Sequence, residues 1–189
     1  MNTTEQIGLI NEAINKTKEQ LRPLGVNFIF WGLLIIAMSL GHWLFPAFIQ
    51  MTSYSALLYW TLLPVLAMVY TVYYNIQVRD KTGYETHIGR VLKIIWSVFN
   101  ISWITIVIAA LSSGQNPSPT IIFLLGITVL SSGLIIKSRP VSLGGGLLFL
   151  LYIGHHFYPE INPFMLNILG LSFGLLIPGF SLYYHKNDA

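Results

Sequence analysis

Residues 26–45 read VNFIFWGLLIIAMSLGHWLF, a run of 20 residues that contains no Asp, Glu, Lys or Arg. An α-helix needs about 20 predominantly apolar residues to cross the roughly 30 Å of hydrocarbon in a bilayer. Similar runs follow at about 54–74, 91–111, 118–136, 141–158 and 163–184, and Lys93 is the only charged residue in them. The sequence therefore predicts an all-α membrane protein with six transmembrane helices.

The composition agrees with a protein that lipid surrounds. Asp, Glu, Lys and Arg make up 9% of the chain, whereas a soluble domain carries about 25% because its surface faces water. The chain has no cysteine, which excludes disulfides, thiolate metal sites and cysteine catalysis. An intramembrane aspartyl protease is excluded as well, since Asp80 and Asp188 are the only aspartates and both lie outside the apolar runs.

The positive charges predict the orientation in the membrane. All ten lie in or beside the N-terminal segment, the connections after the second and fourth spans, or the C-terminal tail: Lys16, Lys18, Arg22, Arg79, Lys81, Arg90, Lys93, Lys137, Arg139 and Lys186. With six spans these regions share one face, which the positive-inside rule makes cytoplasmic. We therefore expect three hairpins with both termini in the cytoplasm. The cations would contact anionic lipid headgroups, and we expect no nucleic-acid partner.

The N-terminal residues 1–23 predict an amphipathic cytoplasmic helix in front of a transmembrane domain at 24–189. One face carries residues at spacings of three and four, namely Ile7, Ile10, Ile14, Thr17 and Leu21, and Pro23 is expected to end the helix. Such a face can lie on the membrane or on the protein's own loops, can pair with a second copy, or can bind a cytoplasmic protein. The sequence leaves these three alternatives open.

Two outer span ends resemble each other. Gly32 is followed by Gly41-His42 and Pro46, and Gly146 is followed by Gly154-His155 and Pro159. An internal duplication explains this echo, and so does the general enrichment of glycine, aromatic residues and proline at helix ends. In the last span, the pair Pro178-Gly179 predicts a kink.

Small and polar residues within the spans predict helix packing. Gly170 and Gly174 form a GxxxG motif in the sixth span, and Ser142 with Gly146 forms a small face on the fifth. Asn100 lies near the middle of the third span, where a polar amide needs a partner. We expect it to bond a neighbouring helix.

The outer histidines are the candidate chemical site. His42, His155 and His156 should lie near the outer interface, and Glu160 is the only carboxylate on that side. Imidazole and carboxylate groups ligate metals, and imidazole also binds haem iron or senses pH. The simpler interpretation, which we favour, is that these histidines are hydrogen-bonded groups at the headgroup boundary. We therefore expect no cofactor and no catalytic residue.

The segments INKTKEQLRP (14–23), NFIFWGLLIIAMSLGHWLF (27–45), GRVLKIIW (89–96) and LIPGFSLYY (176–184) resemble an uncharacterised family of small bacterial inner-membrane proteins. The resemblance implies six spans, a cytoplasmic N-terminal helix and a place in the bacterial inner membrane, and it carries no known activity. The three hairpins are also similar in topology to HdeD-type acid-resistance membrane proteins.

The leading functional hypothesis is a non-enzymatic membrane protein, an oligomeric sensor or scaffold that acts through its N-terminal helix. That helix is the one element able to contact the cytosol extensively. A channel or transporter for a small solute is the first alternative, although no ionisable group lies deep within a span to couple transport to protons or sodium. A metal or haem site at the outer histidines is the second.

Overall fold

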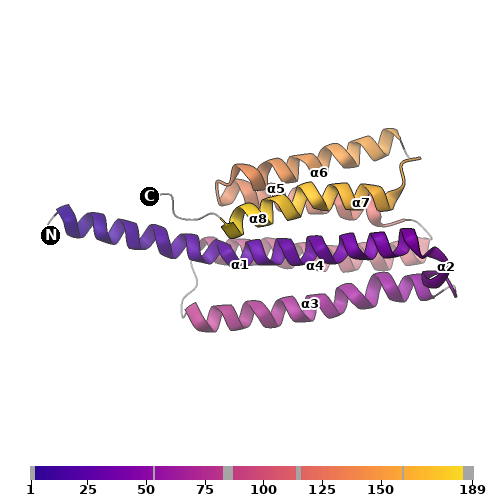
Figure 1. Cartoon of the computed structure of the whole chain (residues 1–189), viewed down its shortest axis with the longest axis horizontal. Coiled ribbons are helices and arrows are strands. Elements are labelled where there is room, and N and C mark those ends of the chain that lie inside the picture. The colour runs from indigo at the N-terminus through magenta and orange to yellow at the C-terminus, as the bar shows by residue number, and fades with distance from the viewer. Residues whose placement is uncertain (1–2, 53, 83–86, 114–115, 159, 185–189) are drawn as a thin grey trace.

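The computed structural model describes residues 3–52, 54–82, 87–113, 116–158 and 160–184, without the side chains of 3–5, 7–20, 79–82 and 111. These residues fold into helices throughout (Figure 1). In chain order they are α1 (Thr3–Leu44), α2 (Pro46–Ile49), α3 (Ser55–Thr82), α4 (His87–Ser113), α5 (Ser118–Ile135), α6 (Arg139–Phe157), α7 (Pro163–Leu171), the π-helical turn η1 (Ser172–Leu176) and α8 (Ile177–Tyr184).

The prediction of six transmembrane helices is confirmed. Six stretches of the described residues are long and apolar enough to cross a bilayer, and they are Leu21–Leu44, Ser55–Val78, His87–Ala110, Ser118–Ile135, Arg139–Phe157 and Pro163–Tyr184. The last combines α7, η1 and α8. The bounds lie within about five residues of those read from the hydropathy pattern, because that pattern reports directly where lipid can solvate the chain.

The prediction that Pro23 ends an N-terminal helix is wrong. α1 runs from Thr3 to Leu44 as one helix of 42 residues with Pro23 inside it. A proline within a helix costs about 3 kcal/mol, mainly because it has no N–H for the carbonyl four residues earlier and crowds that carbonyl. Here that carbonyl belongs to Glu19, before the apolar stretch that begins at Leu21, where water can satisfy it. The N-terminal segment is therefore a continuation of the first span.

The closest pair of helices is α5 with α6, and glycine makes their approach close. A Cβ on Gly145 would lie 2.3 Å from the backbone nitrogen of Leu130, and a Cβ on Gly133 would lie 2.4 Å from that of Ser142. The turn between the two helices is equally tight. Lys137 adopts a left-handed conformation with φ of 55°, and the Ser138 N–H donates to the Gly133 carbonyl at 2.9 Å.

The first and last spans form the second close pair. The backbone carbonyl of Gly179 lies 2.9 Å from where a Cβ on Gly25 would be, and Leu176 packs over Gly32. These contacts run antiparallel along the full apolar part of α1, as Figure 1 shows for α1 beside α7 and α8. The two tightest contacts thus join the fourth span to the fifth and the first to the last, instead of following the three hairpins in chain order.

A π-helical turn interrupts the last span just before the expected kink at Pro178. Ile177 N–H donates to the carbonyl of Ser172, five residues back, instead of four. Pro178 has no N–H to give to Gly174, so the regular ladder cannot continue through this turn. The wider turn lets Gly174 face Leu148 of α6 directly.

Apolar side chains fill the centre of the bundle. The core residues are Phe28, Ile122, Leu125, Val129, Val141, Leu148, Leu166, Leu171 and Leu175, from α1, α5, α6 and the last span. By contrast, α3 lies at one side of the bundle, next to α1 (Figure 1). Only 11% of its apolar stretch and 6% of that of α4 are buried within the protein, compared with 39% for α5.

The predicted packing residues fall into different environments. Gly170 and Gly174 both face Leu148, and Ser142 contacts Gly133, but nothing lies within 4 Å of a Cβ placed on Gly146. Gly145, its neighbour, makes the close contact. Since adjacent helical residues point about 100° apart, Gly145 and Gly146 have different surroundings, and a packing role for Gly146 stays a prediction.

Asn100 also differs from expectation, because its side-chain Nδ2 donates to the Trp96 carbonyl of its own helix at 2.9 Å. This bond closes one turn of α4 and satisfies one of the two side-chain amide N–H groups within the helix. The expected partner on a neighbouring helix is therefore not needed for that donor.

The two halves of the sequence echo do not have equivalent surroundings. Gly32 packs under Leu176, whereas Gly146 faces open space. His42 is buried, whereas His155 is half-buried. The internal duplication stays a hypothesis, without a matching pair of contacts to support it.

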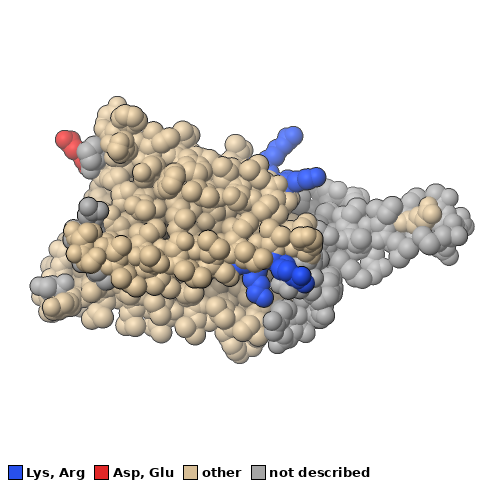
Figure 2. Space-filling view, turned by 180° about the vertical axis from the view of Figure 1, so that it is seen from behind, with Lys and Arg blue, Asp and Glu red and all other residues tan. Residues whose placement is uncertain are grey.

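The described charges separate along the bundle. Figure 2 shows Lys and Arg at the end from which the N-terminal part of α1 extends, and a carboxylate at the opposite end. The described basic side chains are Arg22, Arg90, Lys93, Lys137 and Arg139, and the acidic one is Glu160. This separation is the three-dimensional counterpart of the charge pattern in the sequence.

We expect Gly145→Ala to destabilise the protein by about 1–3 kcal/mol or more, because its methyl group would meet the backbone of Leu130 at 2.3 Å. Gly146→Ala is the matched control, with the same chemical change one residue away in open space, and should leave stability unchanged or slightly raised. Unfolding in mild detergent titrated with a denaturing detergent measures both. Equal stability of the two variants would contradict the packing.

Candidate functional site

A row of hydrogen bonds joins α1 to α3 along their apolar stretches. Within the described residues, three of them link side chain to side chain, and they are Asn27 Nδ2 to Asn75 Oδ1 at 3.0 Å, Trp31 Nε1 to Thr71 Oγ1 at 3.1 Å, and Trp60 Nε1 to His42 Nδ1 at 2.8 Å. We call these six residues the α1–α3 seam. It is the most extensive polar contact between spans that the structure describes.

The seam has the register of two antiparallel helices. Trp31 lies four residues after Asn27 on α1, and its partner Thr71 lies four residues before Asn75, the partner of Asn27, on α3. Eleven further residues to His42 move the partner eleven back to Trp60. Steps of four and eleven keep residues on one face of a helix, because 3.6 residues make a turn.

His42 lies at the end of the seam nearest the C-terminus of α1 and is 6% exposed. Its Nδ1 must accept, because the indole N–H of Trp60 can only donate. The proton of the neutral imidazole is then on Nε2, which lies 2.9 Å from the Gln50 amide nitrogen. Amide nitrogen and oxygen exchange by half a turn of the group, so the oxygen of Gln50 is the atom suited to accept there.

Aromatic rings enclose His42. Phe164 of α7 packs on the imidazole with ring centroids 4.5 Å apart and stacks on Trp60 at 6.4 Å. The Tyr59 hydroxyl donates to the Met38 carbonyl at 3.0 Å, close to the same place. His42 therefore joins α1, α3, α7 and the segment after α2 in one cluster. These contacts indicate a structural role for His42.

The start of the apolar stretch of α1 contacts the last span through Arg22. Arg22 Nη2 donates to the Tyr183 hydroxyl at 3.2 Å, and the guanidinium lies 4.8 Å from the centre of the Tyr183 ring. Both contacts involve exposed groups, so each is worth little by itself. Together they orient the point where α1 leaves the apolar region.

The proposed metal ligands do not meet in one place. In the part of the chain that the structure describes, no three His, Asp or Glu side chains come close enough to hold a metal ion. Both ring nitrogens of His42 already have protein partners. His156 and Glu160 are exposed, and the buried Nδ1 of His155 has no partner among the described residues. For His42, the geometry matches the hydrogen-bonded alternative.

Of the candidate partner residues, Ile7, Ile10 and Ile14 have side chains outside the described ones. Leu21 is described and half-buried. The prediction of an apolar contact face on the N-terminal segment therefore stays a prediction. The helical backbone that carries it is continuous with α1.

Sequence reasoning singled out His42 but missed its partners. Asn27 and Thr71 are common polar residues within apolar runs, and Gln50 lies in a connection. The sequence does contain a signal for these pairs. In the first span Asn27, Trp31 and His42 follow at steps of four and eleven, and in the second span the steps of their partners are eleven and then four. Recognising it requires the register of the two helices, which the hydropathy pattern does not contain.

No protein-family model, curated protein or solved structure matches this chain. The resemblance to a family of small bacterial inner-membrane proteins stays a prediction. Functional inference therefore rests on the contacts of the described residues.

We expect Trp60→Phe to lower stability by about 0.5–1.5 kcal/mol, because it keeps the ring but removes the N–H that His42 accepts. Trp43→Phe is the matched control, since Trp43 is 49% exposed at the same end of the bundle. Unfolding of the two variants in detergent measures the difference. In a His42→Phe background the effect of Trp60→Phe should shrink, and an unchanged effect would contradict the bond.

Proposed function

We propose that the chain is a non-enzymatic membrane protein, a sensor or scaffold that acts through the N-terminal part of α1. The observation that carries the proposal is the continuity of α1 from Thr3 to Leu44. Residues 3–20 precede the apolar stretch and add about 27 Å of helix at 1.5 Å per residue. A continuous helix transmits tilt and rotation from the membrane to its end.

The α1–α3 seam supplies the input in this proposal. α3 exposes most of its surface, with Leu66 56% and Val69 64% exposed, so lipid contacts it over nearly its whole length. Hydrogen bonds between transmembrane helices average about 0.6 kcal/mol. A mismatch between bilayer thickness and helix length costs fractions of a kcal/mol per Å, which is comparable. Changes in the bilayer can therefore shift α3 against α1.

The interior of the bundle supports this proposal over a channel. Large apolar side chains such as Phe28, Val129 and Leu148 fill the space between α1, α5 and α6. A path for a polar solute needs polar groups or water along its walls. The core of the described residues is apolar and packed, which favours a scaffold over a channel.

The location and the partner belong to the same proposal. The end of the bundle with the described Lys and Arg would face the cytoplasm under the positive-inside rule, in a bacterial inner membrane with both termini inside. The face of Ile7, Ile10, Ile14 and Leu21 would then contact a second copy or a cytoplasmic protein. Its apolar spacing supports such a contact.

The coupling is tested with a spin label on Ile10→Cys, which is unique because the chain has no cysteine. In vesicles of thin and thick bilayers, we expect the label's spectrum to differ. Inserting four alanines after Gln20 should preserve the difference, since alanine continues the helix. Inserting four glycines should at least halve it, because glycine interrupts the helix. The proposal would be refuted if the spectrum were the same in thin and thick bilayers, or if the glycine insertion left the difference between them unchanged.

The orientation is tested with two other single cysteines. Ser113→Cys should react with a membrane-impermeant maleimide added to spheroplasts, in which the outer membrane is removed and the inner membrane is closed. Ser138→Cys, at the end with Lys137 and Arg139, should react only after the membrane is opened. The reverse labelling pattern would invert the proposed topology.

A further inference from the structure

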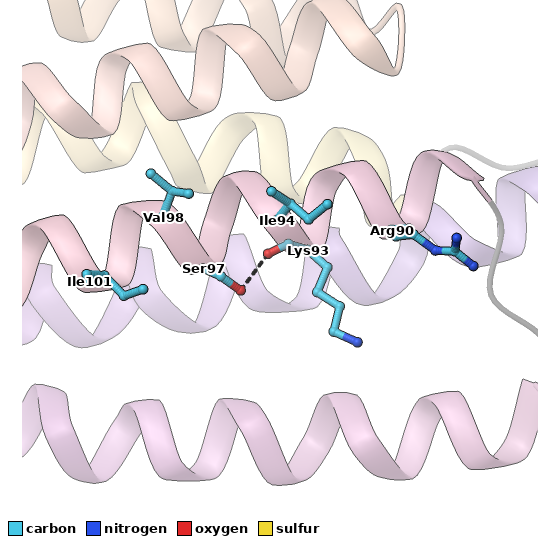
Figure 3. Close-up of a pocket in the computed structure, with 6 residues that line it drawn as sticks. All are labelled: Arg90, Lys93, Ile94, Ser97, Val98 and Ile101. Carbon is cyan, nitrogen blue, oxygen red and sulfur yellow. Dashed lines mark hydrogen bonds between the residues drawn. The ribbon is translucent and has the colours of Figure 1, made fainter.

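An open groove of about 410 Å³ runs along α4 (Figure 3). Its lining residues recur at spacings of three and four and therefore share one face of the helix: Arg90, Lys93, Ile94, Ser97, Val98 and Ile101. Neither the proposed sensor helix nor the α1–α3 seam uses any of them. The groove is thus a separate feature of the molecule.

The groove changes from cationic to apolar along its length. Arg90 and Lys93 are at one end, at the basic end of the bundle, and Val98 and Ile101 are at the other. From Arg90 to Ile101 the helix rises about 16 Å. Half of the hydrocarbon core of a bilayer is about 15 Å thick. The groove therefore extends from the headgroup level to the middle of the bilayer, the depth that one leaflet occupies.

Lipid is the natural cover for this face. Ile94, Val98 and Ile101 are 57%, 56% and 68% exposed. The close backbone contacts of α4 are mainly with α5. Ser97 adds little polarity, since its hydroxyl donates to the Lys93 carbonyl at 2.7 Å (dashed in Figure 3).

The cationic end suits a phosphate group. Arg90 and Lys93 are exposed, lie one turn apart and point out from the same side of α4. Each of the two residues also has an interaction within the chain. A guanidinium has five N–H donors and an ammonium has three, and both groups form charge-assisted hydrogen bonds with phosphate.

We propose that this groove binds one anionic phospholipid of the leaflet at the basic end. Its phosphate lies against Arg90 and Lys93, and one acyl chain lies along Ile94, Val98 and Ile101. The charge at the mouth selects anionic over zwitterionic lipid, and the apolar floor distinguishes a lipid from a free phosphate.

The test is native mass spectrometry of the purified protein with added phosphatidylglycerol or phosphatidylcholine. We expect the native chain to prefer phosphatidylglycerol, and Arg90→Gln with Lys93→Gln to lower that preference about tenfold. Lys137→Gln with Arg139→Gln is the matched control. It removes the same charge at the same end of the bundle, in the α5–α6 turn, and should change the preference less than about twofold. Equal loss in both variants would reduce the effect to general attraction and refute the site.

The apolar part of the groove is tested separately with Val98→Trp, which fills the groove without changing charge. It should weaken phosphatidylglycerol binding severalfold, whereas Leu143→Trp on α6, 74% exposed, should not. Two results would overturn the proposal. One is displacement of the lipid by millimolar glycerol phosphate, which would make this a simple anion site. The other is efficient disulfide formation between copies through Ile101→Cys in membranes, which would make this face a protein interface.

Discussion

Close backbone contact between helices is the constraint on which this bundle depends. Lipid tails are as apolar as leucine, so burying a side chain between spans gains no hydrophobic free energy, and dispersion at short range must hold the helices together. Gly133 and Gly145 bring α5 against α6, and Gly25 and Gly179 bring α1 against the last span. With these two pairs in place, Phe28 and the other core side chains fill the remaining space.

The contact between α1 and α3 is of a different kind, and the proposed function depends on that difference. α3 contacts α1 through side-chain hydrogen bonds of the seam. The contact between α5 and α6, by contrast, is a close approach of their backbones. Hydrogen bonds between spans are individually weak, whereas a packed backbone contact resists any displacement. The bundle thus combines closely packed helices with a span that hydrogen bonds hold, and α1 contacts both.

Hydropathy and charge predicted the six spans well because both report solvation, which acts on each segment separately. Other features depend on more than the type of residue. Proline usually ends or kinks a helix, yet α1 continues through Pro23, where water can satisfy the carbonyl of Glu19. Gly146 and Gly145 are indistinguishable by composition, and only the rotation of α6 decides which one meets Leu130. For Asn100, a carbonyl of its own helix accepts the bond expected from another.

The sequence by itself determined that hydrocarbon surrounds the chain, how many times the chain crosses it, and which ends of the spans carry the positive charge. These properties are sums over local residues and need no partner. Only the tertiary structure decided that the first span packs on the last, that His42 is hydrogen-bonded to Trp60 and Gln50, and that one face of α4 carries a groove with charged and apolar lining. Those features depend on the rotation and register of one helix against another. Contacts between residues far apart in the sequence set both, so the local sequence pattern does not contain them.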